Sequence, residues 1–284
     1  MTTDSGSLPL ALPVKDFSLN QLTCQLLETA DGSYSLRVGT QQHNLSEPMH
    51  SSKGAWSETV SIYLPALEHS LPTRMCTAAG VESGQLWTIA SVGLGLGYNE
   101  IMAAGLALKE SLSAHQLYIE SYEEYWELAD SFRRHFIGTQ RLPKDHPLST
   151  VYADTCRRTA ELFGISETTL HKFINQLLIE GRIILNSRLD TKTLNVTDAS
   201  REKFGCILFD AFSPASSPDL WEAHLLESMV TSMPAQTCVF ASYASRTVLK
   251  KILRTAGFVV HKRTGFAGKR ESTFAVREHK SPSE

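Results

Sequence analysis

The 284-residue sequence has little cysteine, and no two cysteines form a Cys-x-x-Cys pair. The five cysteines are odd in number and far apart along the chain: Cys24, Cys76, Cys156, Cys206 and Cys238. A disulfide framework or a structural zinc site needs paired or closely spaced thiols. We therefore expect reduced thiols, most of them in the core, and no metal site.

Long hydrophobic runs are also missing. No apolar run approaches the roughly 20 residues that span a bilayer, and the start of the chain has no secretory signal. The content of 42% hydrophobic and 20% charged residues is typical of a folded globular protein. Residues 1–16 and 279–284 mix Ser, Pro and polar residues without periodicity, so we expect two mobile tails. We predict a cytoplasmic protein without a membrane partner, whose oligomeric state the sequence leaves open.

An excess of positive charge is absent as well. The chain has 27 Lys and Arg against 30 Asp and Glu, a formal net charge of -3. Such a chain has no global attraction to nucleic acid, so an RNA substrate would have to be held by a local basic patch.

Short apolar runs alternate with helical stretches from Leu86 onward, which predicts βαβ units on a parallel sheet over residues 81–278. The strand-like runs are LWTIAS (86–91), LYI (117–119), RIIL (182–185), CILF (206–209) and CVFAS (238–242). The last two runs, FVVHK (258–262) and STFAVRE (272–278), predict an antiparallel hairpin that closes the sheet edge.

Residues 17–80 differ from this pattern and predict a small N-terminal subdomain. Two strand-like runs between Leu22 and Val38 flank the turn signal Asp31-Gly32-Ser33, which indicates a β-hairpin. The segment from His50 to Leu71 is predicted to be helical.

A helical insertion is predicted over residues 138–181, and its second half imitates a winged helix-turn-helix. A regulator that binds DNA through residues 164–186 is therefore an alternative. Against it, no compact three-helix unit surrounds the pattern, and the helix offers only His171 and Lys172 as outward basic groups. We interpret the segment as a capped helix that precedes the third strand of the sheet.

A glycine-rich loop follows the first strand of the predicted sheet and leads into a helix. Gly93, Gly95 and Gly97 permit tight backbone geometry and close approach of a ligand, and Asn99 stands at the start of the helix, whose N-terminus supplies donors. The spacing matches neither G-x-G-x-x-G nor a G-x-x-x-x-G-K-[ST] phosphate loop. S-adenosylmethionine fits this loop better than NAD or ATP, although a tight turn in an unrelated α/β protein would look similar.

Two further carboxylates are candidates for cofactor binding. Glu120 is predicted to end the strand LYI, where it could accept two hydrogen bonds from a ribose diol. The alternative is that Glu120 is a solvated charge in an acidic helix start, since Glu123, Glu124 and Glu127 follow it. Asp190 comes shortly after the third strand, where an adenine amino group would need an acceptor, but a plain turn aspartate explains it equally well.

Asp210 ends the apolar strand CILF and is the candidate catalytic residue. Ligands bind beyond the carboxyl ends of strands in open α/β sheets, and Asp210 could orient an attacking amine or take its proton. Phe212 and Pro214 stiffen the adjoining loop and are candidate substrate contacts. Trp221 reads as a core residue.

Five motifs occur here in the order found in the methyltransferase domain of MnmC-type enzymes, and the chain resembles that family from about residue 20 to 277. The motifs are DGSYSLRV (31–38), MHSSKGAWSE (49–58), SVGLGLGYN (91–99), FDAFSPASSPDLW (209–221) and AGFVVHKRTGFAGKRE (256–271). The last two are the most specific. The implied fold is a Rossmann-like S-adenosylmethionine-dependent methyltransferase sheet with a C-terminal antiparallel hairpin.

The resemblance implies methyl transfer to the exocyclic amine of 5-aminomethyl(-2-thio)uridine at the tRNA wobble position. It implies a form without the FAD-dependent oxidase to which many relatives are fused. The pairs Lys262-Arg263 and Lys269-Arg270 are predicted to meet tRNA phosphates, with a solvated hairpin edge as the alternative. One departure is that Ser91 stands where relatives carry an acidic residue. A methyltransferase acting on another amine, in a small molecule or a protein, would have the same fold and cofactor site.

Overall fold

The centre of the chain is a seven-stranded sheet in the computed structural model, which describes residues 12–40, 44–72, 86–137, 141–190, 194, 203–268 and 271–278. The strand order is β6 (Ile183–Ser187), β5 (Leu117–Glu123), β4 (Trp87–Val92), β7 (Phe204–Phe209), β8 (Pro234–Ser242), β10 (Ser272–Arg277) and β9 (Val259–Arg263). The first five strands are parallel, whereas β10 runs antiparallel to both β8 and β9. The predicted parallel sheet and its closing hairpin are confirmed.

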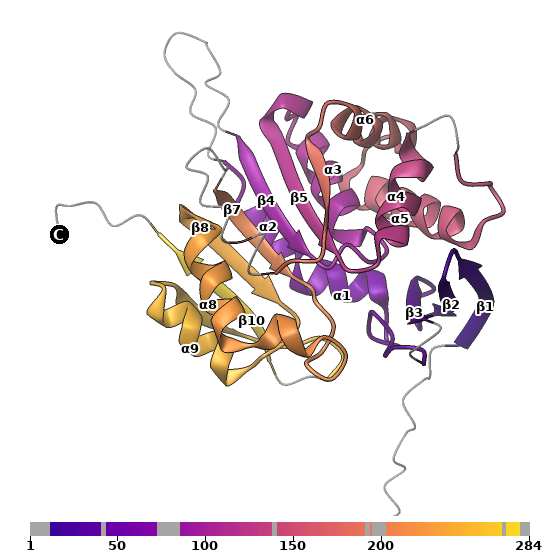
Figure 1. Ribbon diagram of the computed structural model, residues 1–284. Coiled ribbons are helices and arrows are strands. Elements are labelled where there is room, and N and C mark those ends of the chain that lie inside the picture. The colour runs from indigo at the N-terminus through magenta and orange to yellow at the C-terminus, as the bar shows by residue number, and fades with distance from the viewer. Residues whose placement is uncertain are drawn as a thin grey trace, which may run out of the picture.

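Helices cover both faces of this sheet, because its central strands are apolar on both sides. All six residues of β4 are buried, as expected for a parallel strand between two helical layers. One face of the sheet carries six helices: α1 (Ala55–Ile62), α2 (Leu64–His69), α3 (Tyr98–Lys109), α4 (Trp126–Phe136), α5 (Pro147–Phe163) and α6 (Glu167–Ile179) (Figure 1). The other face carries α8 (Ala223–Ser232) and α9 (Thr247–Thr255). Short 3-10 turns occur at Ala114–Gln116 and Pro218–Trp221.

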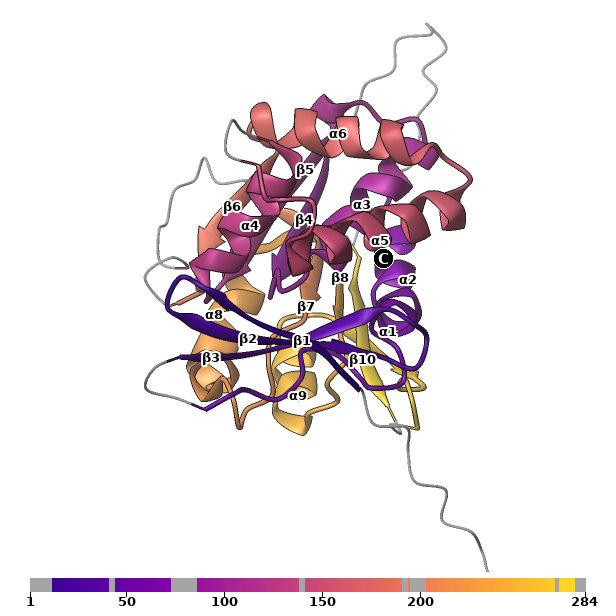
Figure 2. The same ribbon diagram turned by 90° about the vertical axis from the view of Figure 1, so that its right-hand side faces the viewer.

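A separate three-stranded antiparallel sheet precedes the large one. It consists of β1 (Leu12–Leu19), β2 (Leu22–Glu28) and β3 (Tyr34–Thr40), and it lies beside α1 and α5 (Figure 2). The hairpin predicted between Leu22 and Val38 is confirmed. The prediction of a mobile tail over residues 1–16 is wrong from Leu12 onward, since β1 pairs with β2 over its whole length; residues 1–11 and 279–284 lie outside the described part of the chain.

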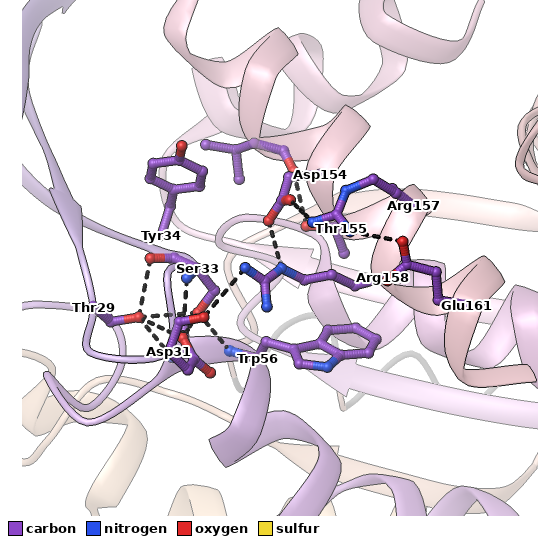
Figure 3. A network of polar contacts seen from close by, with 12 residues as sticks. Thr29, Asp31, Ser33, Tyr34, Trp56, Asp154, Thr155, Arg157, Arg158 and Glu161 are labelled. Atoms are coloured by element: carbon purple, nitrogen blue, oxygen red, sulfur yellow. Dashed lines mark hydrogen bonds and ion pairs between the residues drawn. The ribbon is translucent and has the colours of Figure 1, made fainter.

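Asp31 joins the small sheet to α1. Its carboxylate accepts hydrogen bonds from the side chains of Thr29 and Ser33 and from the backbone N–H and hydroxyl of Ser57 (Figure 3). The guanidinium of Arg158 in α5 donates to the backbone oxygen of Asp31 at 3.3 Å. Two motifs far apart in sequence, DGSYSLRV and MHSSKGAWSE, therefore meet in one polar network that holds the sheet against the helices.

The alternative of a winged helix-turn-helix is wrong. Leu170, Phe173 and Leu177 bury one side of α6 in the main core. The segment that would form the wing is β6, which pairs in parallel with β5 at the edge of the large sheet. The helix is thus the crossover that leads into the third strand of the parallel half.

Four of the five cysteines lie in the described part of the chain and are buried free thiols: Cys24, Cys156, Cys206 and Cys238. Cys76 falls outside it. Among the described helices, none is both long and apolar enough to cross a bilayer.

Candidate cofactor and catalytic site

A cavity opens at the carboxyl edge of the large sheet, where β4 lies between β5 and β7. The strand order reverses at this point, which is where open α/β sheets bind ligands. The loops after all three strands contribute to its wall. The lining includes Met49, His50, Gly93, Gly95, Tyr122, Glu123, Glu124, Arg188, Leu189, Asp210, Phe212, Ser217 and Asp219.

The glycine loop forms the floor of this cavity, as predicted. Gly93 has φ 98°, and a Cβ there would stand 2.5 Å from the carbonyl oxygen of Asp210. Gly95 has φ 51° and donates its N–H to a Glu123 carboxylate oxygen at 2.8 Å. Gly97 is different, because it caps α3 and its missing side chain makes room for the ring of Phe132. Gly93 and Gly95 therefore give a ligand access to the backbone, whereas Gly97 serves helix packing.

The carboxylate at the end of β5 is Glu123, so the prediction for Glu120 is corrected. The strand continues four residues beyond LYI, which leaves Glu120 inside it. The hydroxyls of Tyr118 and Tyr122 donate to the two carboxylate oxygens of Glu120, which is not part of the cavity wall. The sequence indicates an acidic helix start at Glu123, yet Glu123 is buried and lines the cavity.

Two backbone amides hold the Glu123 carboxylate in place. The N–H of Gly95 donates to one oxygen at 2.8 Å and the N–H of Tyr125 to the other at 2.9 Å. Burial raises the pKa of Glu123 to about 7, although these hydrogen bonds oppose the shift. Each carboxylate oxygen has a further lone pair for a ligand hydroxyl.

Asp210 follows β7 and lies on the opposite side of the glycine loop from Glu123. The hydroxyl of Tyr63 donates to its Oδ1 at 2.7 Å, and Nδ2 of Asn99 donates to its Oδ2 at 3.0 Å. Tyr63 in turn accepts the backbone N–H of Tyr243 at 3.3 Å. Asn99, predicted as a cofactor residue, is buried and acts here by positioning Asp210.

The surroundings of Asp210 suit a proton acceptor. Burial raises its pKa to about 6, while the nearby His50 and the hydrogen bond from Tyr63 work in the opposite direction. The pKa of Tyr63 is raised well above its usual value by burial and by Asp210, so its hydroxyl remains a donor. His50 was missed from the sequence; it lines the cavity, and its buried Nδ1 has no hydrogen-bond partner among the described atoms.

The other predicted site residues divide into those near the cavity and those away from it. Phe212 lines the cavity, and its carbonyl accepts the indole N–H of Trp221 at 2.7 Å. Pro214 and Asp190 are not among the lining residues, whereas Arg188 and Leu189, which directly precede Asp190, are. The predicted contacts Lys269 and Arg270 lie outside the described residues.

Arg188 spans the cavity rim through two ion pairs that the sequence did not predict. Its guanidinium lies 3.0 Å from Asp219 Oδ2 and 3.7 Å from Glu124 Oε1. These three residues follow three different strands, so the pairs connect the loops on both sides of the opening.

A buried carboxylate accompanies the unusual Ser91. Glu100 in α3 accepts a hydrogen bond from the Ser121 hydroxyl at 2.7 Å. Burial raises the pKa of Glu100 to about 7, and the hydroxyls of Ser121 and Ser91 oppose that shift. An acidic side chain therefore lies near Ser91, although neither residue is part of the cavity wall.

The cavity suits S-adenosylmethionine on three observations. Side chains at Gly93 and Gly95 would narrow the floor where a ligand meets the backbone. Glu123 presents a fixed carboxylate acceptor for ribose hydroxyls. The unpartnered Nδ1 of His50 and the Asp210 carboxylate offer polar partners on the other side. Gly93, Gly95 and Glu123 would hold the cofactor, which leaves Asp210 and His50 for the methyl acceptor.

Comparisons with known proteins agree with this geometry. Residues 161–278 match the model of a family described as S-adenosyl-L-methionine-dependent methyltransferase. The chain is 24% identical over 214 residues to the "tRNA 5-methylaminomethyl-2-thiouridine biosynthesis bifunctional protein MnmC" of Idiomarina loihiensis, covering 74% of this chain and 32% of that protein. The protein of the same name from Paraburkholderia xenovorans is 23% identical over 241 residues, covering 82% and 34%. The chain thus spans about a third of the length of these relatives.

A solved structure has the same fold. The crystal structure of MnmC2 from Aquifex aeolicus superposes with a TM-score of 0.55 at 22% identity, covering 96% of this chain and 74% of that one. The sheet order and the glycine loop agree with the family that residues 161–278 match. The chain has a Rossmann-like fold, its residues 161–278 match the S-adenosylmethionine-dependent methyltransferase family, and it is similar to the MnmC-type proteins.

Proposed function

We propose that this enzyme methylates the primary amine of 5-aminomethyl(-2-thio)uridine at the wobble position of tRNA, giving the 5-methylaminomethyl product. The observation that supports this best is Asp210, a buried carboxylate beside the glycine loop that is held by Tyr63 and Asn99. The names of the similar proteins concern biosynthesis of this same modified nucleoside. With tRNA as its substrate, the enzyme would act in the cytoplasm.

The acceptor nitrogen must be neutral before it can react, because an ammonium has no lone pair. An aliphatic amine is mostly protonated at pH 7. Asp210 attracts the ammonium as a carboxylate and then accepts one proton, which frees the lone pair to form the new N–C bond. A pKa near 6 suits this task, because most of the carboxyl is ionised at pH 7 and still basic enough to share a proton.

Alignment accounts for the rest of the rate enhancement. When bound, the cofactor supplies a methyl group already activated by a sulfonium. The backbone N–H of Asp210 donates to the carbonyl of Val92, directly before Gly93, so the cofactor floor and the amine site are joined by the backbone of the sheet. This arrangement fixes the distance between the two reactants, and such positioning can lower the activation free energy substantially. Phe212 offers an aromatic surface for the uracil ring at the same edge.

The test is incubation with S-adenosylmethionine labelled in its methyl group and tRNA isolated from cells that lack this methylation, followed by digestion and mass spectrometry of the nucleosides. We expect the label in 5-methylaminomethyl(-2-thio)uridine. Labelled tRNA with the methyl group on another nucleoside would refute the proposed acceptor. Label on a small amine or a protein, and none on tRNA, would refute the substrate class.

A further inference from the structure

Acidic residues are absent from one long part of the chain. Between Glu227 and Glu271 the sequence contains eight Lys and Arg and no Asp or Glu, whereas the remainder has 19 basic against 30 acidic residues. The overall charge of -3 therefore conceals one basic region within an acidic protein. This region comprises β8, α9 and β9.

Two basic side chains of α9 face solvent. Leu249, Ile252 and Leu253 bury one side of the helix against the second core, while Lys251 and Arg254 are exposed one turn apart. Arg246, directly before the helix, is exposed as well. Lys251 and Arg254 thus lie on the solvent side of the helix, and Arg246 lies at its N-terminal end, about 12 Å along the axis from Arg254.

This helix face begins at the active edge of the sheet. β8 ends at Ser242, and the next residue, Tyr243, contacts Tyr63 and donates its hydroxyl to the carbonyl of Ala211, beside Asp210. From there α9 runs back along the outside of the helix layer that also contains α8 (Figure 1). The charges therefore start beside the methyl-acceptor site and lead away from it.

The edge strand β9 extends the same surface. Lys262 is exposed and electrostatically coupled to Glu271, the acidic residue that ends the acid-free stretch and is paired with Lys250 at 2.5 Å. Arg263 lies over the ring of Phe274 at 4.8 Å, on the face of the sheet opposite to α9, so it is not part of this surface. The turn between β9 and β10 lies at the active edge, since Thr273 pairs with Ser242.

We propose that Arg246, Lys251, Arg254 and Lys262 form the surface that binds the phosphates of the RNA strand leading to the reactive nucleotide. Exposed cations in a stretch whose one acidic neighbour, Glu271, is already paired with Lys250 fit a polyanion, and their position lets the backbone run along α9 while one base enters the cavity. This inference rests on the proposed function and identifies the helix, not only the C-terminal hairpin, as the docking element.

The test compares two charge-reversed double variants of the full-length enzyme. Lys251→Glu with Arg254→Glu changes the proposed surface, and Lys144→Glu with Lys172→Glu, two exposed lysines near α5 and α6, is the matched control. Binding of undermodified tRNA is followed by fluorescence anisotropy at several KCl concentrations. Calorimetry with S-adenosylmethionine and a thermal melt check that each variant is folded.

We expect the α9 variant to bind tRNA roughly ten-fold more weakly and with a slope of log K against log salt that is shallower by about 1 to 2. The control should match the wild type, and both should bind the cofactor normally. Equal weakening in both variants, or none in either, overturns the docking surface. If the wild type methylates tRNA but the α9 variant binds it unchanged, only the docking inference fails; if the wild type neither binds nor methylates tRNA, the proposed function fails too.

Discussion

Asp31 and Asp210 both accept hydrogen bonds from side-chain donors, yet their pKa values move in opposite directions. Asp31 is partly buried, and although burial opposes ionisation, hydrogen bonds from Ser33 and Ser57 lower its pKa to about 2 (Figure 3). Asp210 accepts two side-chain hydrogen bonds at the cavity wall, and burial raises its pKa to about 6.

The difference distinguishes a carboxylate with a structural role from one suited to acid–base chemistry. A carboxylate that is saturated with donors holds its neighbours together and cannot readily take a proton. A buried carboxylate with few donors is less stable as an anion and accepts a proton more readily. Asp31 therefore holds the small sheet in place, whereas Asp210 has the properties that the proposed proton acceptor needs.

The largest effect is expected from Asp210→Asn. The amide keeps the shape but removes both the charge that attracts an ammonium and the site that takes its proton. Turnover at pH 7 should fall by about 10² to 10⁴ while affinity for the cofactor, measured by calorimetry, stays nearly intact. Loss of cofactor binding in a folded variant would move Asp210 into the cofactor site.

A smaller loss is expected from Glu123→Gln. An uncharged amide makes weaker hydrogen bonds to ribose hydroxyls and cannot accept from Gly95 and Tyr125 at both ends. Affinity for S-adenosylmethionine should fall by about 10- to 100-fold, equivalent to about 1.5–3 kcal/mol. The control is Glu120→Gln on the same strand, which should leave affinity unchanged; the opposite ranking would restore the role predicted for Glu120.

Asp31→Asn should affect stability rather than activity. The single side-chain oxygen of Asn would have to accept the hydrogen bonds that two carboxylate oxygens accept in Asp31, and its NH2 group would face the N–H and hydroxyl donors of Ser57. Because Asp31 is partly exposed, we expect only about 1–2 kcal/mol of lost unfolding free energy, a fall in Tm of roughly 3–6 °C. Asp16→Asn on exposed β1 is the control for removing a negative charge. An unchanged Tm in Asp31→Asn would show that the network does not hold the small sheet in place.

The smallest effect is the pH dependence of the ligand-free protein. The folded pKa values of Asp210, Glu100 and Glu123 lie above their ordinary values, so folding favours their protonated forms and their contribution to stability falls as the pH rises through about 6 to 7. Burial lowers the pKa of His135 to about 4, which offsets part of this effect in the same range. Lowering the pH from 8 to 6 should therefore raise the stability by only about 1 kcal/mol, seen as a higher Tm. Asp31 contributes in the opposite sense, and only below about pH 4. A Tm that falls between pH 8 and 6 would contradict the raised values.

The sheet and its glycine loop were predictable because each strand is a local apolar run and each turn a local glycine pattern. The end of β5 could not be predicted in the same way. Ser121, Tyr122 and Glu123 look polar in sequence and become buried only because β4 and β6 pair on either side of β5. Assigning the ribose contact to Glu120 followed from that error.

The hydrogen-bond partners of Asp210 could not be predicted from the sequence, for a different reason. Tyr63 and Asn99 lie 147 and 111 residues before it in the chain, and neither has a local pattern that marks it as a partner. The acid-free stretch that includes α9 was visible in the sequence, but its exposure and its start beside Ala211 depend on how the sheet closes.

The most direct test of the role assigned to Asp210 is the pH dependence of single-turnover methyl transfer with saturating tRNA, measured for the wild type and for Asp210→Asn between pH 6 and 9. If Asp210 takes the proton, the wild-type rate reaches its plateau at a low pH, whereas the rate of the variant keeps rising with pH as the amine loses its proton to solvent. The gap between the two should narrow steadily with pH. A gap that stays constant across this range would contradict the role of Asp210 as a proton acceptor.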